Sequence, residues 1–422
     1  MIEMKEIVQT IGGIVQALLK QPRKAFEYLV GDPRKWVTPF NAVAAAILAV
    51  GIPVIGLRLW KGLAAVTNLS QETPWGLWIG FDVLCGVALA AGGYTIAATV
   101  YLFGLKRYHG LLRPAVLTGF LGYTFVVIGL ILDLGQPWRM PYMMIFPRGV
   151  TSVLFEVGWC VALYLTVQAV EFSPTVLEWA GLKQLRDLFA KAAVWLTIFA
   201  LVLSTLHQSS LGALFLLAPT KLHPLWYSPY IPLYFFVSSI IAGLSMVIVE
   251  SSLSHKIFEN RLSTGEHTDL DDLTLGLGKA AAVALYAYFF IKLIGLADSM
   301  EWDLLGTPYG HWFLVEMLGF VALPCALYTV AVRTQSVKLV RFTGAWTVLG
   351  ILVNRLNVSI IAMNWNKSPH YVPSWMEVMV SVTLITMGVL LFRWIVNRMP
   401  VLAEDEPRQG GKSLVGALTG KA

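Results

Sequence analysis

Charged side chains are scarce in this chain of 422 residues: Lys, Arg, Asp and Glu together make up 13% of it, against about 25% in an ordinary soluble domain. Apolar residues make up 57%, and the mean hydropathy is +0.68. This balance excludes an ordinary water-soluble protein and indicates a chain that lies in a bilayer. Because lipid offers no partner to a free backbone N–H or C=O, such a chain forms a helical bundle or a closed barrel. The long unbroken apolar runs favour helices.

Cysteine is also rare. Cys85, Cys160 and Cys325 each lie inside an apolar run, and the sequence has no Cys-x-x-Cys or Cys-x-x-Cys-His motif. We therefore expect no iron–sulfur cluster and no covalently attached haem in this chain. No apolar run carries two histidines at positions suited to axial ligation of a b-type haem. We accordingly expect no haem and no metal site.

Long basic stretches are missing as well. The net charge of +6 could attract nucleic acid, but the basic residues lie in short connections between apolar runs. In that position they orient a membrane protein, and we expect no nucleic-acid partner. The segment from Met1 to Lys35 is mixed and amphipathic rather than patterned as a cleavable signal peptide. We expect the first apolar run to act as the insertion signal.

What the chain does have is apolar runs long enough to span a bilayer core, which takes about 20 residues. We predict an all-α, polytopic membrane bundle of ten transmembrane helices, at 38–60, 76–104, 114–135, 150–172, 190–217, 230–252, 275–297, 311–332, 340–362 and 375–397. They form one transmembrane domain, 38–397, between an amphipathic N-terminal segment, 1–37, and a disordered tail, 398–422. The 253–274 connection is polar and mixed in charge.

Basic residues alternate between the two sets of connections. Most of them lie in the two tails and in the connections near residues 107, 186, 256 and 338, and few lie in the opposite set. The positive-inside rule assigns the basic set to the cytoplasm. We therefore expect both termini to be cytoplasmic, in a multi-pass protein of the bacterial cytoplasmic membrane.

The opposite connections carry aromatic residues instead of charge. Trp75, Trp138, His223 and Trp226 lie in them or at their edges. Aromatic side chains at this level usually anchor helices at the membrane interface. They could also form a docking surface for a partner on the outer face, and the sequence leaves both interpretations open.

Ionisable side chains inside the predicted spans are the main functional signal, because each costs several kcal/mol unless it is paired or hydrated. With the orientation above, the outer half of the membrane holds Asp82, Asp133, Glu156, His207, Lys292, Glu316, Arg355 and Glu377. We interpret Lys292, Glu316, Arg355 and Glu377 chiefly as structural ion pairs that support a site. Carboxylates and imidazole can also transfer protons, and we assign that role to Asp82, Asp133, Glu156 and His207.

The most polar stretch within any span runs from Thr205 to Gly212 and reads Thr-Leu-His-Gln-Ser-Ser-Leu-Gly. A lone histidine on an apolar face is usually a satisfied core residue. Here His207, Gln208, Ser209 and Ser210 are adjacent, so their side chains face several directions round the helix. Some of them must line a cavity or a helix contact, and we add Gln208 and Ser210 to the candidate site.

In their order and amino-acid sequence, several segments resemble the NrfD/HybB family of membrane anchors, and within it the membrane subunit of Hyb-type periplasmic nickel–iron hydrogenases. The resemblance covers about 70 to 380 and rests on Pro74-Trp-Gly-Leu-Trp-Ile-Gly-Phe-Asp82, Gly92-Gly93, Tyr108-His109, Leu112-Arg-Pro-Ala115, Asp133-Leu-Gly135, Ser152-Val-Leu-Phe-Glu156, Glu171-Phe172, His207-Gln-Ser-Ser-Leu-Gly212, His223-Pro-Leu-Trp226, Pro373-Ser-Trp375 and Glu377. The tail after Pro400 matches nothing in the family pattern.

The resemblance implies a cofactor-free helical anchor that receives electrons from a ferredoxin-like iron–sulfur subunit and passes them to a quinone such as menaquinone. It implies nickel–iron hydrogenase small and large subunits as further partners. It also implies that Asp82, Asp133, Glu156 and His207 surround the quinone pocket, with His207 and Asp133 as a hydrogen-bonding and proton-donating pair. Other family members serve polysulfide, sulfite, nitrite and cytochrome-linked complexes, and these stay as alternatives.

Two further questions stay open at this point. Glu250, near the inner end of the sixth span, is the candidate uptake point for protons from the cytoplasm, although a carboxylate at a helix end is often merely solvated. A proton-coupled secondary transporter is the rival function, but transporters commonly show internal repeats and a midplane site. We find no repeat, and the charges lie off centre. A passive scaffold that only tethers its partners is the third possibility.

Overall fold

The computed structural model describes Gly12 and residues 37–402, except 71–72, 74–76, 147–148, 258–265 and 368–369. The described residues form helices and no strand. Ten helical stretches are long and apolar enough to cross a membrane. The prediction of an all-α bundle with ten spans is therefore confirmed. Most of the predicted N-terminal segment and C-terminal tail lies outside the described residues.

Six of the ten spans in the described part of the chain are single helices, and four are composed of several helical segments. In chain order they are α3 (Pro39–Lys61), α4 (Leu77–Leu89) with α5 (Gly92–Ala97) and the π-helical η3 (Ala98–Leu102), η4 (Lys106–Leu111) with α6 (Leu112–Asp133), α8 (Val153–Ala180), α10 (Ala193–Leu216), α11 (Ile231–Ile257), α12 (Glu266–Ser299), α13 (Pro308–Leu314) with the π-helical η8 (Val315–Ala322) and α14 (Leu323–Arg333), α15 (Val337–Leu356) with the π-helical η9 (Asn357–Ile361) and α16 (Ala362–Asn364), and α17 (Trp375–Arg398). Short helices in the connections are η2 (Leu63–Ala65), η5 (Pro137–Arg139), α7 (Tyr142–Ile145), α9 (Lys183–Lys191) and η7 (Trp302–Gly306).

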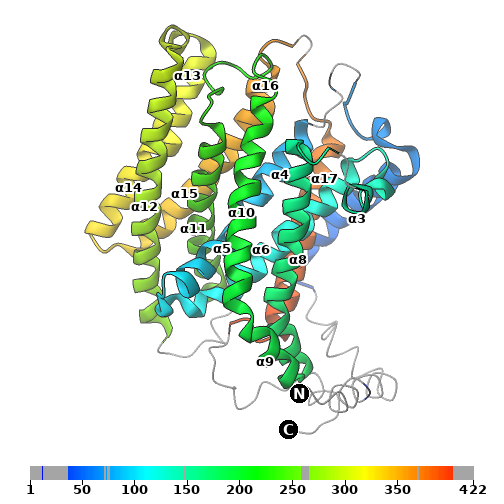
Figure 1. Ribbon diagram of the computed structural model, residues 1–422, viewed down its shortest axis with the longest axis vertical. Coiled ribbons are helices and arrows are strands. Elements are labelled where there is room, and N and C mark those ends of the chain that lie inside the picture. Colours follow the sequence, from blue (N-terminus) through cyan, green and yellow to red (C-terminus); the bar gives the residue numbers. More distant parts are fainter. Residues whose placement is uncertain are drawn as a thin grey trace.

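The spans run between two ends of the bundle, which we call the upper and the lower end after the orientation of Figure 1. α13 and α16 lie at the upper end and α9 lies at the lower end (Figure 1). The spans reach the upper end at Lys61, Asp133, Leu216, Ser299 and Asn364. Since the number of spans is even, α3 begins and α17 ends at the lower end.

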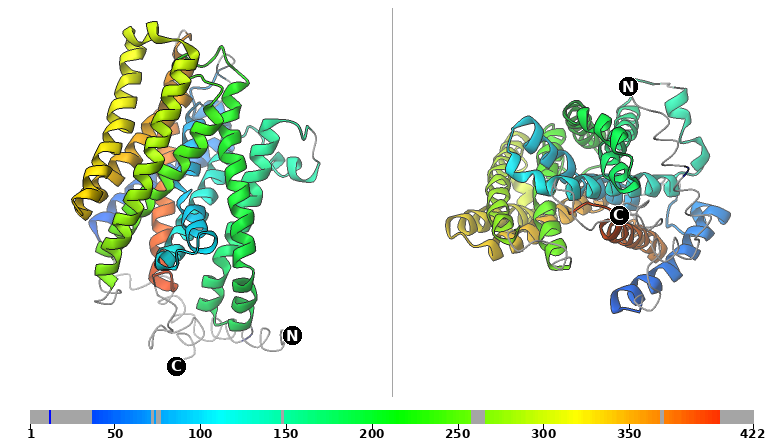
Figure 2. Two further views of the ribbon diagram at one scale, coloured as in Figure 1. Left: turned by 60° about the vertical axis from the view of Figure 1, so that its left-hand side comes forward. Right: turned by 90° about the horizontal axis from the view of Figure 1, so that it is seen from below.

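The second span is the centre of the bundle and the first is its edge. α4 and α5 pack against α6 and α11, and α4 also packs against α15. α8 and α10 pack beside them on one side, and α12 and α14 pack against α11 and α15 on the other. α3 packs mainly on α17 and lies at the periphery when the bundle is seen from below (Figure 2, right). Any site that includes α4 is therefore inside the protein.

Small residues allow the central helices to approach closely. A Cβ atom added to Gly243 of α11 would lie 2.7 Å from the backbone nitrogen of Gly92 and the carbonyl carbon of Ala91. No side chain larger than hydrogen fits there without moving the backbone. Close backbone packing of this kind replaces the hydrophobic effect as the force between helices in lipid.

The central span is interrupted between α4 and α5, next to the contact of Gly92 with Gly243. α4 ends at Leu89 and α5 begins at Gly92, and the N–H of Ala91 donates to Ala88 O at 3.2 Å instead of continuing the α-helical pattern. Three spans also contain the π-helical turns η3, η8 and η9. Such turns are rare in proteins and are frequently found at functional sites.

The predicted span boundaries agree with the structure to within a few residues at most ends, but three spans were predicted too short. α8 continues to Ala180, through Pro174, where the sequence suggested an end near 172. The polar 253–274 connection is helical at both ends, because α11 runs to Ile257 and α12 starts at Glu266. Hydropathy marks the part of a helix inside the bilayer core, and these helices project beyond it.

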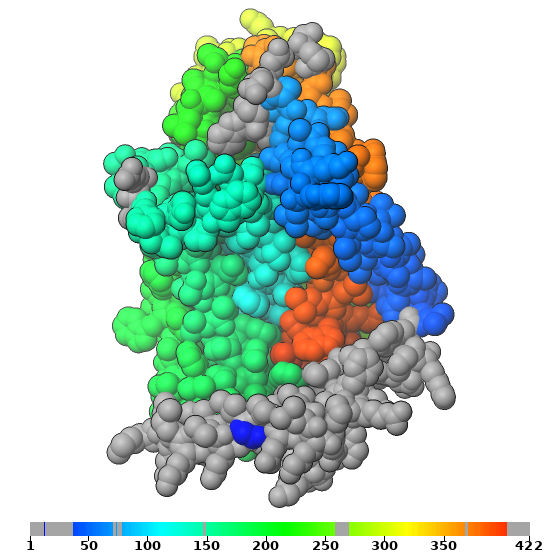
Figure 3. All heavy atoms as spheres, turned by 90° about the vertical axis from the view of Figure 1, so that its right-hand side faces the viewer, coloured from blue at the N-terminus to red at the C-terminus, as the bar shows by residue number. Residues whose placement is uncertain are grey.

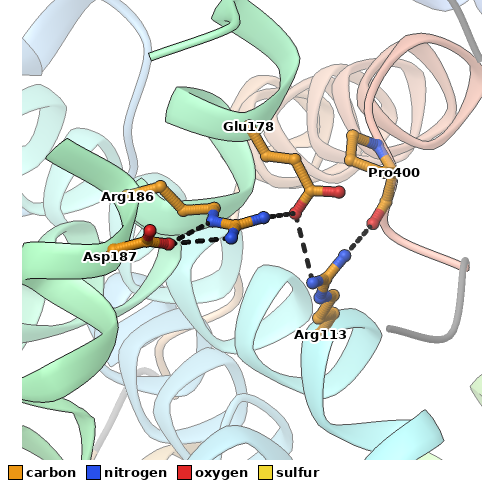
Figure 4. Close-up of polar contacts among 5 residues, drawn as sticks. All are labelled: Arg113, Glu178, Arg186, Asp187 and Pro400. Carbon is orange, nitrogen blue, oxygen red and sulfur yellow. Dashed lines mark hydrogen bonds and ion pairs between the residues drawn. The ribbon is translucent and has the colours of Figure 1, made fainter. Parts of the chain in front are cut away.

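An ion network at the lower end holds four chain segments together (Figure 4). Arg113 donates to Pro400 O at 2.8 Å, just after α17, and to Glu178 Oε2 of α8 at 3.2 Å. Arg186 of α9 lies 4.0 Å from the same Glu178 oxygen and bonds to Asp187. These side chains are partly exposed, so salt screens them and each pair contributes little to stability.

Candidate functional site

Three carboxylates from three distant parts of the sequence come together near the upper end. Asp82 lies in the second turn of α4, Asp133 is the last residue of α6, and Glu377 lies in the first turn of α17. Asp82 interacts electrostatically with Asp133, and Asp133 interacts with Glu377. We call Asp82, Asp133 and Glu377 the carboxylate cluster. The sequence predicted Asp82 and Asp133 as site residues, but it assigned Glu377 a merely supporting role.

A chain of hydrogen bonds ends on Asp82. The indole Nε1 of Trp78 donates to Ser381 Oγ at 2.6 Å, and Ser381 Oγ donates to Asp82 Oδ2. Trp78 and Asp82 are one helical turn apart on α4, while Ser381 comes from α17. This chain of hydrogen bonds therefore fixes the Asp82 carboxylate in place and leaves its other oxygen without a hydrogen bond to the described residues.

The position of the Glu377 carboxylate is explained by its role in capping α17. It forms a capping box with Ser374, in which Glu377 N donates to Ser374 Oγ at 3.2 Å and Ser374 N donates to Glu377 Oε2 at 2.7 Å. The phenol of Tyr371 donates to Glu377 Oε1 at 2.5 Å. Burial raises the pKa of the Tyr371 phenol, and the bond to Glu377 and the nearby negative charges raise it further. Tyr371 therefore stays protonated and remains a donor.

Arg58 is a residue that the sequence did not mark as part of the site, because it was counted among the charges of the outer connections. Its side chain turns inward from α3 and is only 4% exposed. It donates through Nε to Leu132 O and through Nη2 to Leu134 O, at the carboxyl end of α6, and interacts electrostatically with Asp133. A cation at the carboxyl end of a helix also interacts favourably with the negative end of the helix dipole. Only the packing of α3 against the end of α6 reveals this role.

Replacing Arg58 with Gln should destabilise the upper end of the bundle. The change removes the cation beside Asp133 and weakens two bonds to main-chain carbonyls, and a hydrogen bond from a charged group contributes about 1.5–3 kcal/mol. We expect a lower thermal midpoint for the purified protein in mild detergent. Arg139→Gln is the matched control, since Arg139 is an exposed arginine in the next connection at the same end. Equal midpoints for both variants would contradict the role given to Arg58.

His207 lies in a fully buried row, separate from the carboxylate cluster. Its Nδ1 donates to Leu203 O at 2.6 Å, and its Nε2 accepts from the phenol of Tyr123. Tyr123 packs edge-on to Tyr164, whose hydroxyl accepts from Gln168 Nε2 at 3.1 Å. We call Gln168, Tyr164, Tyr123 and His207 the His207 row. The ring of His207 is 0% exposed.

The expected pairing of His207 with Asp133 is not present in the structure. Tyr123, the partner of His207, precedes Asp133 by ten residues on α6, which is about 15 Å along the helix axis. Both imidazole nitrogens are already engaged. His207 therefore belongs to the middle of the bundle, and it has no free donor for a ligand at the upper end.

The remaining polar residues of the 205–212 segment bind to neighbouring helices. Gln208 Nε2 donates to Val87 O at 3.0 Å, close to the break after α4. Ser210 Oγ donates to Glu156 Oε1 of α8 at 2.7 Å. The sequence left open whether these side chains line a cavity or a helix contact, and the structure places Gln208 and Ser210 at helix contacts. Glu156 therefore bonds to Ser210 and, within the described residues, makes no hydrogen bond to the carboxylate cluster.

Glu250 lies in the lower half of α11 with both carboxylate oxygens buried and without a hydrogen-bond partner among the described residues. The hydroxyl of Thr118 on α6 faces this carboxylate, although the two groups do not reach ordinary hydrogen-bond geometry. On the neighbouring helices, the buried atoms Gln168 Oε1 and Ser204 Oγ also lack partners among the described residues. These four residues come from four adjacent helices, and buried unpaired polar atoms of this kind are ordinarily bridged by water.

A second buried polar cluster surrounds Glu316, the second residue of η8. Glu316 Oε1 accepts from Asn354 Nδ2 at 2.6 Å, and Oε2 accepts from Trp226 Nε1 at 2.8 Å and from Asn357 Nδ2 at 2.5 Å. Arg355 donates to Asn354 Oδ1 at 3.0 Å and to Ser238 Oγ at 2.8 Å. We call Glu316, Asn354, Arg355, Asn357 and Trp226 the Glu316 cluster. The negative charge of Glu316 acts electrostatically on the amine of Lys292, but the two side chains make no ion pair in the described structure.

The residues predicted to dock a partner divide into two groups. Trp138 is 72% exposed near the upper end and stays available to a partner or to lipid headgroups. His223 and Trp226 are 4% and 2% exposed, so they offer little surface to a partner in this conformation, and their docking role stays a prediction. His223 packs on Tyr309 and Trp365, and burial lowers the pKa of its imidazole. Trp75 lies outside the described residues.

A family model described as "Polysulphide reductase, NrfD" matches residues 65–365 of the chain. Over 360 residues the chain is 31% identical to the "Probable Ni/Fe-hydrogenase 2 b-type cytochrome subunit" of Escherichia coli strain K12, covering 84% of this chain and 90% of that protein. Over 385 residues it is 28% identical to the "Menaquinone reductase, integral membrane subunit" of Nitratidesulfovibrio vulgaris, covering 82% and 87%. Another protein of that organism is 53% identical over 370 residues, covering 87% and 95%.

The name of the Escherichia coli relative raises the question of haem. A b-type haem needs an imidazole nitrogen that is free to bind the iron. His207, which lies deep within a span, has both nitrogens engaged, and the ring is enclosed by Tyr123 and Tyr164. His223 accepts from Leu225 N through Nδ1 and is packed among aromatic rings. The surroundings of His207 and His223 therefore do not fit a haem.

Proposed function

The chain belongs to the NrfD family, and on that premise we propose that it is the quinone-reactive membrane subunit of a respiratory nickel–iron hydrogenase complex. The observation that carries the proposal is the carboxylate cluster near the upper end, where Ser381 and Tyr371 hold Asp82 and Glu377 in place through hydrogen bonds. Quinone carbonyl oxygens need hydrogen-bond donors and titratable groups nearby. The names of the relatives, a hydrogenase subunit and a menaquinone reductase subunit, agree with this substrate and partner.

In the proposed reaction a quinone takes up two electrons and two protons and leaves as the quinol. The electrons come from a ferredoxin-like iron–sulfur partner, which itself receives them from the hydrogenase subunits. Asp82 and Asp133 transfer the protons to the two carbonyl oxygens and are reprotonated by water. The guanidinium of Arg58 stabilises the ionised form of Asp133, and the hydroxyl of Ser381 orients the carboxylate of Asp82. The upper end is then the outer face of the bacterial cytoplasmic membrane, with both termini in the cytoplasm.

The quinone tail has a route to this site along one side of the bundle. Figure 3 shows α6 exposed in a recess between α8 on one side and α3 and α17 on the other. α3 carries exposed apolar side chains, including Ile52, Leu59 and Trp60. An isoprenoid chain in lipid could lie along this surface while the head group reaches the end of α6.

His207 then acts away from the quinone, as part of a proton route. Glu250 takes up protons at the lower end, and Thr118, Gln168 and the His207 row continue toward Gln208 and α4 through bridging waters. The unpaired oxygens of Glu250, Thr118 and Gln168 support this proposal, since they supply the bonds that such waters would need. Proteoliposomes with Glu250→Gln would test it. Unchanged formation of a membrane potential during turnover would exclude the route.

The first test is to solubilise the tagged protein from its own membrane and identify what co-purifies by mass spectrometry, together with quinone extraction. Nickel–iron large and small subunits with an iron–sulfur protein would support the hydrogenase complex. A molybdenum enzyme or a multihaem cytochrome would keep the quinone role and move the chain to another branch of the family. An isolated chain without quinone would overturn the proposal and favour a proton-coupled transporter.

Asp133→Asn separates quinone chemistry from assembly in the same complex. We expect slower quinone reduction with unchanged reduction of a soluble dye, because the dye takes electrons before they reach this subunit. A passive scaffold predicts no effect on either activity. Equal loss of both would show that the complex had failed to assemble.

A further inference from the structure

A small crevice opens near the upper end, in the half of the bundle that the quinone proposal does not use. It lies where the connection after α10 meets the start of α11, the end of α12 and α13. The wall carries aromatic rings, hydroxyls and one amine, from Trp226, Ser228, Tyr234, Lys292, Ser299 and Phe313. A polar lining with a single cation indicates an anionic ligand.

Lys292 is the unusual member of this wall. Its side chain is 6% exposed, and among the described residues its amine makes no hydrogen bond or ion pair. Nζ lies 5.0 Å from the ring centre of Tyr234 and 5.4 Å from that of Phe313. Two aromatic faces stabilise a cation, but they do not accept its three N–H bonds. Those bonds point to a ligand in the crevice.

The neighbouring charges do not balance Lys292. Glu316 is the acid whose charge acts on Lys292, and Arg355, a second buried cation, acts on it as well. The two oxygens of Glu316 already accept three N–H bonds from Trp226, Asn354 and Asn357. Asp298 acts on Tyr234 from an exposed position at the rim and makes no ion pair with Lys292. Two buried cations thus share one carboxylate, and an unpaired buried charge is costly.

We propose that the Lys292 crevice binds the phosphate group of an anionic phospholipid. Ser299 marks the end of the span, so the mouth of the crevice lies at the level of the headgroups. Lys292 is seven residues further in, which is about 10 Å along the axis, and its apolar stem can carry the amine toward the mouth. Exposed apolar residues flank the site, Leu233 on α11 and Leu293 and Ile294 on α12. They supply contacts for acyl chains, which a free phosphate ion would not use.

Gly295 shapes the wall beside the amine. A Cβ atom at this position would lie 1.8 Å from the hydroxyl oxygen of Tyr234 and 3.0 Å from Ser228 Oγ. The absence of a side chain lets the phenol of Tyr234 pack against α12, with its ring beside Lys292. Gly295→Ala therefore displaces Tyr234 and changes the crevice without removing a charge.

The test uses the full-length protein, purified in mild detergent and placed in nanodiscs of phosphatidylcholine with or without phosphatidylglycerol. Native mass spectrometry counts bound lipid, and a thermal melt gives the midpoint. We expect the wild type to retain one more phosphatidylglycerol than Lys292→Met and Gly295→Ala, and to melt higher when that lipid is present. Lys292→Arg should retain the lipid. Lys279→Met is the control, because Lys279 is an exposed lysine on the same helix.

Three outcomes would overturn the proposal. The first is the same lipid count in wild type and Lys292→Met. The second is stabilisation of the wild type by inorganic phosphate to the same extent as by phosphatidylglycerol, which would identify a free anion. The third is loss of the lipid difference once the partner subunits are bound, which would identify an acidic protein group as the occupant. If Lys292→Met does not fold, the comparison of Gly295→Ala with wild type decides the question. None of these results depends on quinone activity.

Discussion

Replacing Asp82 with Asn is expected to lower quinone reduction by the assembled complex at least about tenfold, since general acid–base groups commonly contribute 10²–10⁴-fold. Asn keeps the size of the side chain and can still accept the Ser381 hydroxyl. It cannot carry a proton. The change therefore removes proton transfer while leaving the hydrogen-bond chain from Trp78 in place. Quinol formation, measured with the natural electron donor in the same complex, gives the result.

The control for this prediction is Asp271→Asn. Asp271 is a partly exposed acid that bonds to Arg341 at the lower end of α12, so its loss should not change quinone reduction. Dye reduction by each variant reports on assembly. If Asp82→Asn reduced quinone at the wild-type rate, the carboxylate cluster would not be the proton donor. Glu156 and Ser210 would then be the next residues to change.

Glu316→Ala should produce the largest loss of stability in the molecule. The carboxylate is the shared counter-charge of Arg355 and Lys292, and it accepts three hydrogen bonds. Its removal leaves two cations and three N–H donors buried without their acceptor. Breaking a buried pair in this way costs about 3–5 kcal/mol. We expect little protein in the membrane, and a strongly lowered thermal midpoint for whatever is purified.

A second substitution shows whether charge or shape is responsible. Glu316→Gln keeps an acceptor oxygen and the volume of the side chain, so it should lie between wild type and Glu316→Ala. Adding Lys292→Met to Glu316→Gln removes one of the two unpaired cations and should recover part of the loss. A double variant no better than Glu316→Gln would show that Lys292 does not sense the charge of Glu316.

The ten spans could be predicted from sequence because they depend on a local property. Each run of apolar residues has to satisfy its own backbone hydrogen bonds in lipid, so composition over about 20 residues is sufficient. The same argument selected Asp82, Asp133, Glu316 and Arg355, because an ionisable group in such a run must have a partner. It failed at α8 and at the ends of α11 and α12, where a helix continues beyond the bilayer core.

Partners could not be predicted in this way. Asp82 bonds to Ser381, which is separated from it by most of the chain, and Arg58 bonds to carbonyls at the end of α6. His207 was expected beside Asp133, but its position on α10 brings it to Tyr123 instead. His223 and Trp226 have the composition of an interface belt, yet they are buried. The spacing of residues along separate helices says nothing of how those helices are rotated and paired.

The sequence by itself determined that this protein is a ten-helix membrane bundle, which residues in it carry intramembrane charge, and which family it resembles. All three follow from local hydropathy or from the order of short segments. The tertiary structure decided which charges share a site. Asp82, Asp133 and Glu377 lie together near the upper end, whereas His207 lies in the middle of the bundle. The amine of Lys292 makes no hydrogen bond or ion pair within the described residues. The physical reason is that small residues such as Gly92 and Gly243 fix how closely the central helices pack, and this packing sets every pairing between spans.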